Sequence, residues 1–155
     1  MEYLTAEKPE GCIFCLKLAE DSDRENLILH RGERACLMLN RYPYNSGHMM
    51  VIPHAHVPTL EALDEETLLE MMLLINKGLC ALREVMHPEG FNVGVNIGSA
   101  AGAGIDEHVH IHIVPRWEGD TNFMTIFAET RIVPELLDDT YLKLKAILEK
   151  DSPSP

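Results

Sequence analysis

The run His108-Val109-His110-Ile111-His112-Ile113-Val114 alternates three histidines with aliphatic residues. A period of two is typical of a β-strand with one buried face, so the aliphatic side chains are expected in a core and the three imidazoles on the opposite side. Neighbouring imidazoles on such a strand would lie roughly 6.5–7 Å apart. Because histidine gains or loses a proton near neutral pH, a rigid series of imidazoles suggests that they perform chemistry.

Three interpretations of this run compete: a surface strand, a metal site, or an enzyme in which one imidazole attacks an electrophile. Three positions on one face of a strand span about 13 Å, which is too far for one tetrahedral ion to bind all three, so at most two histidines could share a metal. In the nucleophilic interpretation His110 is the geometric choice, because His108 and His112 lie on either side of it.

The composition limits the class of protein. The chain has 155 residues, of which 46% are hydrophobic, enough for one well-filled core. The sequence contains neither a run of about eighteen apolar residues, which a membrane span needs, nor the features of a secretory signal. With four cysteines, the expected setting is therefore the reducing cytoplasm. The formal net charge of −12 argues against a nucleic-acid partner but allows a small phosphorylated substrate.

Hydrophobic periodicity and turn residues predict strands at 27–30, 35–40, 48–53, 91–97 and 108–114, and a further strand within 123–132. Residues 11–16 should form one or two helical turns. Asp64 is the expected N-cap of a long helix that ends near Met86, and Pro134 opens a C-terminal helix. We expect residues 1–155 to form a single α+β domain on an antiparallel sheet, with residues 1–10 as an N-terminal arm and residues 151–155 as a disordered tail.

The long helix has a wide apolar face. One stripe recurs every three or four residues: Leu68, Met72, Ile75, Leu79, Leu82 and Met86. Further apolar residues lie beside that stripe: Leu69, Met71, Leu73 and Leu74. So wide a face could cover the sheet and also contact a partner subunit, although a broad core face is the simpler explanation.

Several segments outside the histidine run carry further motifs: Asn40-Arg41-Tyr42-Pro43-Tyr44-Asn45-Ser46-Gly47-His48, Pro53-His54-Ala55-His56, Asn96 with the small-residue loop 98–104, Pro115-Arg116-Trp117 and Gly119-Asp120-Thr121-Asn122-Phe123-Met124. Together with the three histidines they resemble the histidine triad (HIT) superfamily of nucleotide hydrolases and transferases over residues 11–135. The last segment, with residues 130–135, most resembles the bacterial branch that acts on diadenosine polyphosphates. The resemblance implies a HIT-like domain with a five-stranded antiparallel sheet, a long central helix and a C-terminal helix.

The resemblance also implies roles for the triad, His108, His110 and His112. His110 would attack the α-phosphate of a nucleotide and carry the nucleotidyl group, while His112 would contact the phosphates near the leaving group. His108 would be structural, either bonding to backbone or binding a metal. Many members of the family carry a Ser, Thr or Gln just before the triad, whereas Gly104-Ile105-Asp106-Glu107 precedes His108 here. The choice between hydrolysis and transfer to phosphate therefore stays open.

Nucleotide-binding residues follow from the same resemblance. Asn40 resembles the position that meets the sugar, and Asn96 with the loop that contains Ser99, Gly102 and Gly104 resembles the phosphate cradle. Glycines let backbone amides approach an anion closely, although a plain flexible turn is the alternative. Phe14, with Leu37 or Leu39, could form an apolar slot for a purine base, or these side chains could simply fill the core.

Cys12 and Cys15 form half of a possible zinc site. The alternatives are a redox pair and two buried thiols that pack as small hydrophobic groups. The resemblance adds His56 and His108 as the remaining ligands of a structural Cys2His2 zinc. The triad chemistry itself requires no dissolved metal, and Mg²⁺ would enter only with a polyphosphate substrate. His48 and His54 are expected at the pocket rim or on the surface.

The sequence therefore predicts an enzyme that cleaves a dinucleoside polyphosphate, such as diadenosine tetraphosphate, through a nucleotidyl-histidine intermediate resolved by water or inorganic phosphate. The alternatives are a nucleoside phosphoramidate or adenylylated-amine hydrolase, a non-catalytic nucleotide-binding protein, and a metallohydrolase that uses the histidines as ligands. The wide helix face and the resemblance both favour a homodimer.

Overall fold

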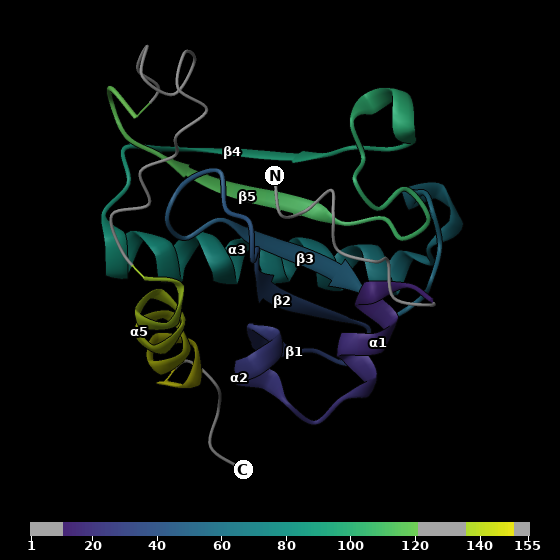
Figure 1. The fold of residues 1–155 in the computed structure, drawn as a ribbon, viewed down its shortest axis with the longest axis horizontal. Coiled ribbons are helices and arrows are strands. Elements are labelled where there is room, and N and C mark those ends of the chain that lie inside the picture. The colour runs from purple at the N-terminus through teal and green to yellow at the C-terminus, as the bar shows by residue number, and fades with distance from the viewer. Residues whose placement is uncertain (1–10, 121–135, 151–155) are drawn as a thin grey trace.

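The computed structural model describes residues 11–120 and 136–150. Five antiparallel strands form one sheet in the order β1-β2-β3-β5-β4 (Figure 1): β1 (Ile28–Arg31), β2 (Ala35–Leu39), β3 (Met49–Pro53), β4 (Gly90–Val95) and β5 (Ile111–Arg116). The prediction of an α+β fold on an antiparallel sheet is confirmed. The predicted arm, the tail and the strand within 123–132 fall outside the described residues.

The long helix α3 (Glu65–Met86) covers one face of the sheet, as Figure 1 shows. It begins as predicted, because the Asp64 carboxylate accepts a hydrogen bond of 2.7 Å from the Thr67 backbone N–H. At Gly78 the helix meets the sheet so closely that an added Cβ would lie 3.2 Å from Ile113 and 3.2 Å from Met49. The side chains of β2, β3 and β5 on this face are therefore packed against α3.

The buried stripe of α3 differs from the prediction. Its buried members are Thr67, Met71, Leu74, Ile75, Gly78, Ala81 and Leu82. Met72, predicted in the core, is 54% exposed, and Leu69 and Leu73 are also exposed. A helix with two adjacent apolar stripes can turn either one inward, and the close approach at Gly78 fixes which one is buried.

Among the helices of the described residues, none combines the length and the hydropathy that a membrane span requires.

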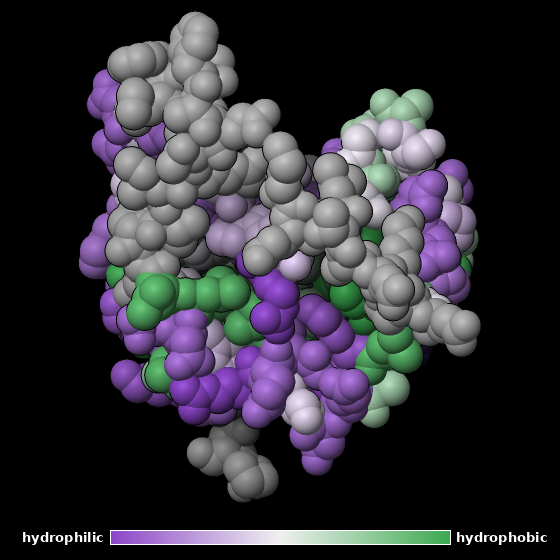
Figure 2. Space-filling model, viewed as in Figure 1, coloured by the Kyte–Doolittle hydropathy of each residue, from purple (hydrophilic) through white to green (hydrophobic). Residues whose placement is uncertain are grey.

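Three further helices complete the described fold: α1 (Ile13–Ala19), α2 (Asp23–Asn26) and α5 (Leu137–Lys150). α5 packs beside β1, where the Tyr141 hydroxyl donates to the Ile28 carbonyl at 3.1 Å and Lys145 donates to the Leu29 carbonyl at 3.0 Å. On the face shown in Figure 2, hydrophilic residues predominate over the described surface and apolar residues form smaller separate areas, as the net charge of −12 suggests.

The histidine-bearing strand starts later than predicted. β5 begins at Ile111, so His112 lies in the strand whereas His108 and His110 precede it. Before Ile111 the chain leaves the sheet ladder, and the Val109 N–H bonds to the Val57 carbonyl at 2.8 Å. Val109 (2% exposed) and Ile113 (0%) are buried as expected, but burial does not alternate along the segment, because His108 (0%) and His110 (6%) are buried as well and Ile111 is only half-buried.

Candidate active site and metal centre

The triad lies on the face of the sheet opposite α3. Met50, the β3 partner of His112, and Met49, the partner of Ile113, point to opposite faces, and Met49 and Ile113 contact α3. The ring centroids of His110 and His112 are 4.8 Å apart. The rings therefore lean together more closely than their spacing along an extended chain suggests.

His110 is fixed in one tautomer by the backbone carbonyl of His108. Its Nδ1 lies 2.9 Å from the His108 carbonyl oxygen. A carbonyl oxygen only accepts, so Nδ1 carries the proton and donates it. In the neutral ring Nε2 then bears a lone pair, as nucleophilic attack requires. His110 as a whole is 6% exposed, so only a small part of the ring is accessible.

His112 is fixed in the opposite tautomer by His48. The Tyr44 backbone N–H donates to His48 Nδ1 at 3.0 Å, so the neutral His48 ring carries its proton on Nε2. His48 Nε2 lies 2.9 Å from His112 Nδ1 and donates to it. Neutral His112 must therefore carry its own proton on Nε2. The pair presents one imidazole with a lone pair, His110, next to one with an N–H donor, His112.

His48 is the functional residue that sequence reasoning missed. It was expected at the rim or surface, but it is 0% exposed. The sequence does place His48, Met50 and Ile52 on one face of the predicted strand 48–53. The structure adds that Met50 pairs with His112, which brings this face to the triad. The other candidate of that kind, His54, is exposed as expected.

Burial keeps both reactive imidazoles neutral. It lowers the pKa of His110, against the opposing effect of the His108 carbonyl that accepts its proton. Burial, and secondly the neighbouring His110, lower the pKa of His112 to about 4. At pH 7 neither ring is charged, so His110 keeps its lone pair and His112 keeps its single N–H.

Of the predicted nucleotide-binding residues, Asn40 contacts the imidazoles of the site, whereas the predicted phosphate cradle is an exposed loop. Asn40 is adjacent to His48, with 3.5 Å between its Nδ2 and His48 Nε2, and its Oδ1 accepts from the Tyr42 N–H at 2.9 Å. Val95, the last residue of β4, pairs with Ile111, the first residue of β5, and Asn96 directly follows Val95 in the chain. Ser99, Gly102 and Gly104 lie in an exposed loop that includes the short helix η3 (Ser99–Ala101).

The predicted base slot does not form as expected. Phe14 is 4% exposed and packs edge-on against His108 and His110, with ring centroids 5.4 and 5.0 Å away. Leu39 is 1% exposed and pairs with Met49, which places it on the α3 side of the sheet. Leu37 also faces Gly78 of α3. The structure therefore brings Phe14, but neither leucine, to the triad.

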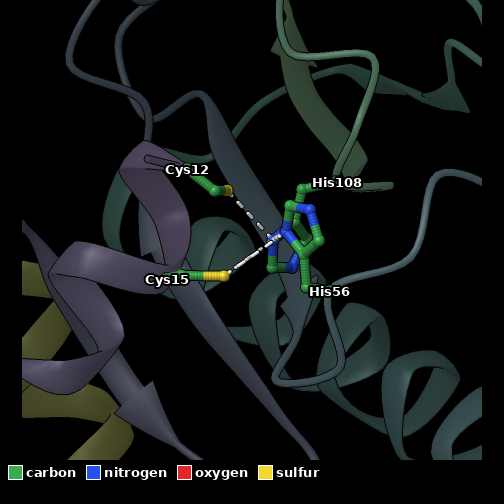
Figure 3. A group of neighbouring side chains, drawn as sticks. All are labelled: Cys12, Cys15, His56 and His108. Atoms are coloured by element: carbon green, nitrogen blue, oxygen red, sulfur yellow. Dashed lines mark hydrogen bonds between the residues drawn. The ribbon is translucent and has the colours of Figure 1, made fainter. Parts of the chain in front are cut away.

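Four side chains converge beside the triad: Cys12, Cys15, His56 and His108. As Figure 3 shows, the two cysteines point from the start of α1 towards the two imidazoles. His108 Nδ1 lies 3.3 Å from Cys12 Sγ, 3.6 Å from Cys15 Sγ and 3.3 Å from His56 Nδ1. All four potential ligand atoms lie within 4.8 Å of one another.

This geometry fits a tetrahedral metal ion. Nitrogen and sulfur atoms bound at about 2.0–2.3 Å in a tetrahedron lie about 3.3–3.8 Å apart. The three distances from His108 Nδ1 and the 3.4 Å between Cys15 Sγ and His56 Nδ1 fall in this range. His108 Nε2 donates to the Pro53 carbonyl at 2.8 Å, which leaves the Nδ1 lone pair directed at the other three ligands. These four residues can therefore hold a metal with every position filled.

His110 and His112 do not belong to this metal group. Within the described residues no other group of three or more His, Cys, Asp or Glu side chains converges in this way. His108 connects the two centres, because its ring belongs to the metal group while its carbonyl holds His110. The two imidazoles outside the metal group, His110 and His112, thus supply a nucleophilic nitrogen and a hydrogen-bond donor.

Comparisons with known proteins agree with this geometry. The HIT domain family matches residues 22–119. A protein named AP-4-A phosphorylase from Mycobacterium tuberculosis is 45% identical over 119 residues, 77% of this chain and 61% of that protein. The chain thus spans about three fifths of that relative's length. The asymmetrical bis(5'-nucleosyl)-tetraphosphatase of Schizosaccharomyces pombe is 30% identical over 60% of this chain and 50% of its own length.

A solved structure is similar over nearly the whole chain. The crystal structure of a Zn-bound histidine triad family protein from Mycobacterium smegmatis has a TM-score of 0.73 and 29% identity, and the match covers 90% of this chain and 94% of that one. Because the family match covers more than half of the chain and the triad has the geometry described above, the chain belongs to the HIT family.

Proposed function

We propose that this protein cleaves dinucleoside polyphosphates, with diadenosine tetraphosphate as the reference substrate, by transferring a nucleotidyl group to His110 and then to inorganic phosphate. The observation that carries the proposal is the pair of opposite tautomers, a lone pair on His110 Nε2 beside an N–H on His112 Nε2. The names of the M. tuberculosis and S. pombe relatives support the substrate class.

In the first half-reaction the His110 Nε2 lone pair forms a bond to the α-phosphorus, and the bond from that phosphorus to the bridging oxygen of the β-phosphate breaks. With diadenosine tetraphosphate the leaving group is ATP. The His112 Nε2–H donates a hydrogen bond to the departing oxygen and keeps its proton, so that ATP leaves as an anion whose new charge this hydrogen bond stabilises. The positive charge that develops on the His110 ring is stabilised because Nδ1–H already donates to the His108 carbonyl.

In the second half-reaction an oxygen of inorganic phosphate attacks the same phosphorus, and the nitrogen–phosphorus bond breaks. The product is ADP, and His110 recovers its lone pair. Water can take the place of phosphate, in which case the product is AMP. The M. tuberculosis relative is named a phosphorylase, so we propose phosphate as the preferred acceptor.

The first prediction concerns the nucleophile. With diadenosine tetraphosphate and phosphate, the wild-type protein should release ATP and ADP, and without phosphate any turnover should give AMP and ATP. His110→Asn should abolish turnover and still bind the nucleotide, because it removes only the attacking nitrogen. Product chromatography and calorimetric titration measure the two effects. His87→Asn is the matched control, since His87 is exposed and has a left-handed conformation (φ 49°) that Asn tolerates.

An active His110→Asn variant would exclude histidine nucleophilic catalysis. Binding without turnover in the wild type would favour the non-catalytic nucleotide-binding protein. Cleavage of an adenosine phosphoramidate but not of the dinucleotide would favour the phosphoramidate hydrolase.

The second prediction concerns His48 as a positioning residue. His48→Ala removes the donor that fixes the His112 tautomer, so kcat should fall about 10- to 100-fold with little change in KM. His48→Gln keeps an N–H donor and should restore part of kcat. Steady-state kinetics test this, and equal losses in both variants would show that the hydrogen bond is not what matters.

The third prediction concerns the metal. We propose that Cys12, Cys15, His56 and His108 bind one structural zinc, which holds α1 against His108. Metal analysis should find one zinc per chain, and chelation should lower the Tm by more than about 4 °C, which at this size corresponds to over 1 kcal/mol. Replacing zinc by cobalt should leave kcat nearly unchanged. A large change in kcat would favour a metallohydrolase. None of the four cysteines forms a disulfide, and two of them face the metal site, which supports our proposal that the protein works in the reducing cytoplasm.

The fourth prediction concerns the partner subunit. The exposed apolar residues of α3, Leu69, Met72 and Leu73, support a homodimer in which a second copy of the chain covers this face. Leu73→Glu should convert the dimer to a monomer in sedimentation equilibrium. Leu142→Glu on α5, also an exposed leucine, is the matched control and should remain dimeric. A wild-type monomer would contradict the proposal.

A further inference from the structure

The turn between β2 and β3 carries more than Asn40 and His48. Two large aromatic side chains lie between them, Tyr42 with 51% and Tyr44 with 53% of their surface exposed. Exposed aromatic side chains beside a reactive centre are typical of binding surfaces, because they offer a rigid apolar face and a polar tip. Neither tyrosine has a part in the reaction described above.

Tyr44 is held against His48 and close to His112. Its ring stacks on His48, with centroids 4.8 Å apart and an interplanar angle of 30°, and it lies 6.3 Å from the His112 ring. Its own backbone N–H donates to His48 Nδ1. The position of the Tyr44 ring is therefore tied at two points to the imidazole that orients His112.

The reaction places the leaving group at the His112 end of the site. In the proposed reaction His112 donates a hydrogen bond to the oxygen that departs, so the leaving phosphates begin beside the His112 ring, which lies 6.3 Å from the Tyr44 ring. With a dinucleoside polyphosphate that chain ends in a second nucleoside, and its flexible phosphates allow the base to turn onto a nearby surface. Aromatic side chains bind bases of any identity by stacking, typically with about 1–3 kcal/mol per base.

We propose that Tyr44 stacks on the base of the leaving nucleotide and so makes the enzyme prefer substrates with two nucleosides over substrates with one. This inference rests on the proposed function and names a specificity-determining residue for it. It names Tyr44 because the Tyr44 ring lies against both His48 and His112.

A second role for Tyr44 must be distinguished from stacking. The ring also packs on His48, so its loss could disturb the His48–His112 hydrogen bond. Such a disturbance would act on the chemical step and affect every substrate equally. Stacking on the second base would affect only substrates that contain one.

The experiment therefore compares diadenosine tetraphosphate with adenosine 5'-tetraphosphate, which has the same number of phosphates and a single base. The variants are Tyr44→Leu, which keeps an apolar cover on His48, and Tyr44→Phe, which keeps the aromatic face. Tyr44→Leu should raise KM for the dinucleotide about tenfold and leave KM and kcat for the mononucleotide unchanged. Tyr44→Phe and the matched control Tyr42→Leu should behave as the wild type.

Equal losses of Tyr44→Leu on both substrates would overturn the inference and assign the ring to the support of His48. An unchanged KM of Tyr44→Leu for the dinucleotide would overturn it as well. If the wild type cleaves neither substrate, the proposed function itself is wrong and the inference falls with it. Cleavage of both substrates by the wild type with equal KM would overturn the inference alone.

Discussion

The hydrogen bond from His110 Nδ1 to the carbonyl oxygen of His108 is the contact on which the site depends. It spans only two residues, so the local backbone sets it and no distant element has to move for it to form. It assigns the proton to one ring nitrogen and leaves the lone pair on the other. An imidazole that rotated freely would spend part of its time with the wrong nitrogen directed at a substrate.

The rest of the fold holds the residues on either side of that bond. The ring of His108 lies among Cys12, Cys15 and His56 and bonds to the Pro53 carbonyl, and Phe14, between the two cysteines, packs against both His108 and His110. At the other end His48 fixes His112. The imidazoles at both ends of the triad, His108 and His112, are thus held in fixed orientations. Such preorganisation favours the transfer of a group to His110.

The chain is acidic, but the hydrogen bonds described for the three triad imidazoles involve no carboxylate. The recorded partners of these imidazoles are other imidazoles, cysteine sulfurs and backbone carbonyls. Burial keeps the rings neutral, since it lowers the pKa of both His110 and His112. Neutral donors and a neutral nucleophile can approach a polyphosphate without an opposing negative charge, although the chain as a whole carries −12.

The sequence by itself determined the sheet and the long helix with its Asp64 cap, because strand alternation and capping chemistry are local properties. Of the four converging ligands its pattern offered only the Cys12 and Cys15 pair, and the resemblance to the HIT family added His56 and His108. Only the tertiary structure decided that α3 buries Leu74 rather than Met72, that Leu39 faces α3 rather than the triad, and that His48 is buried against His112. Each of these depends on which faces of two separate elements meet, and a linear pattern specifies a periodicity but not its partner.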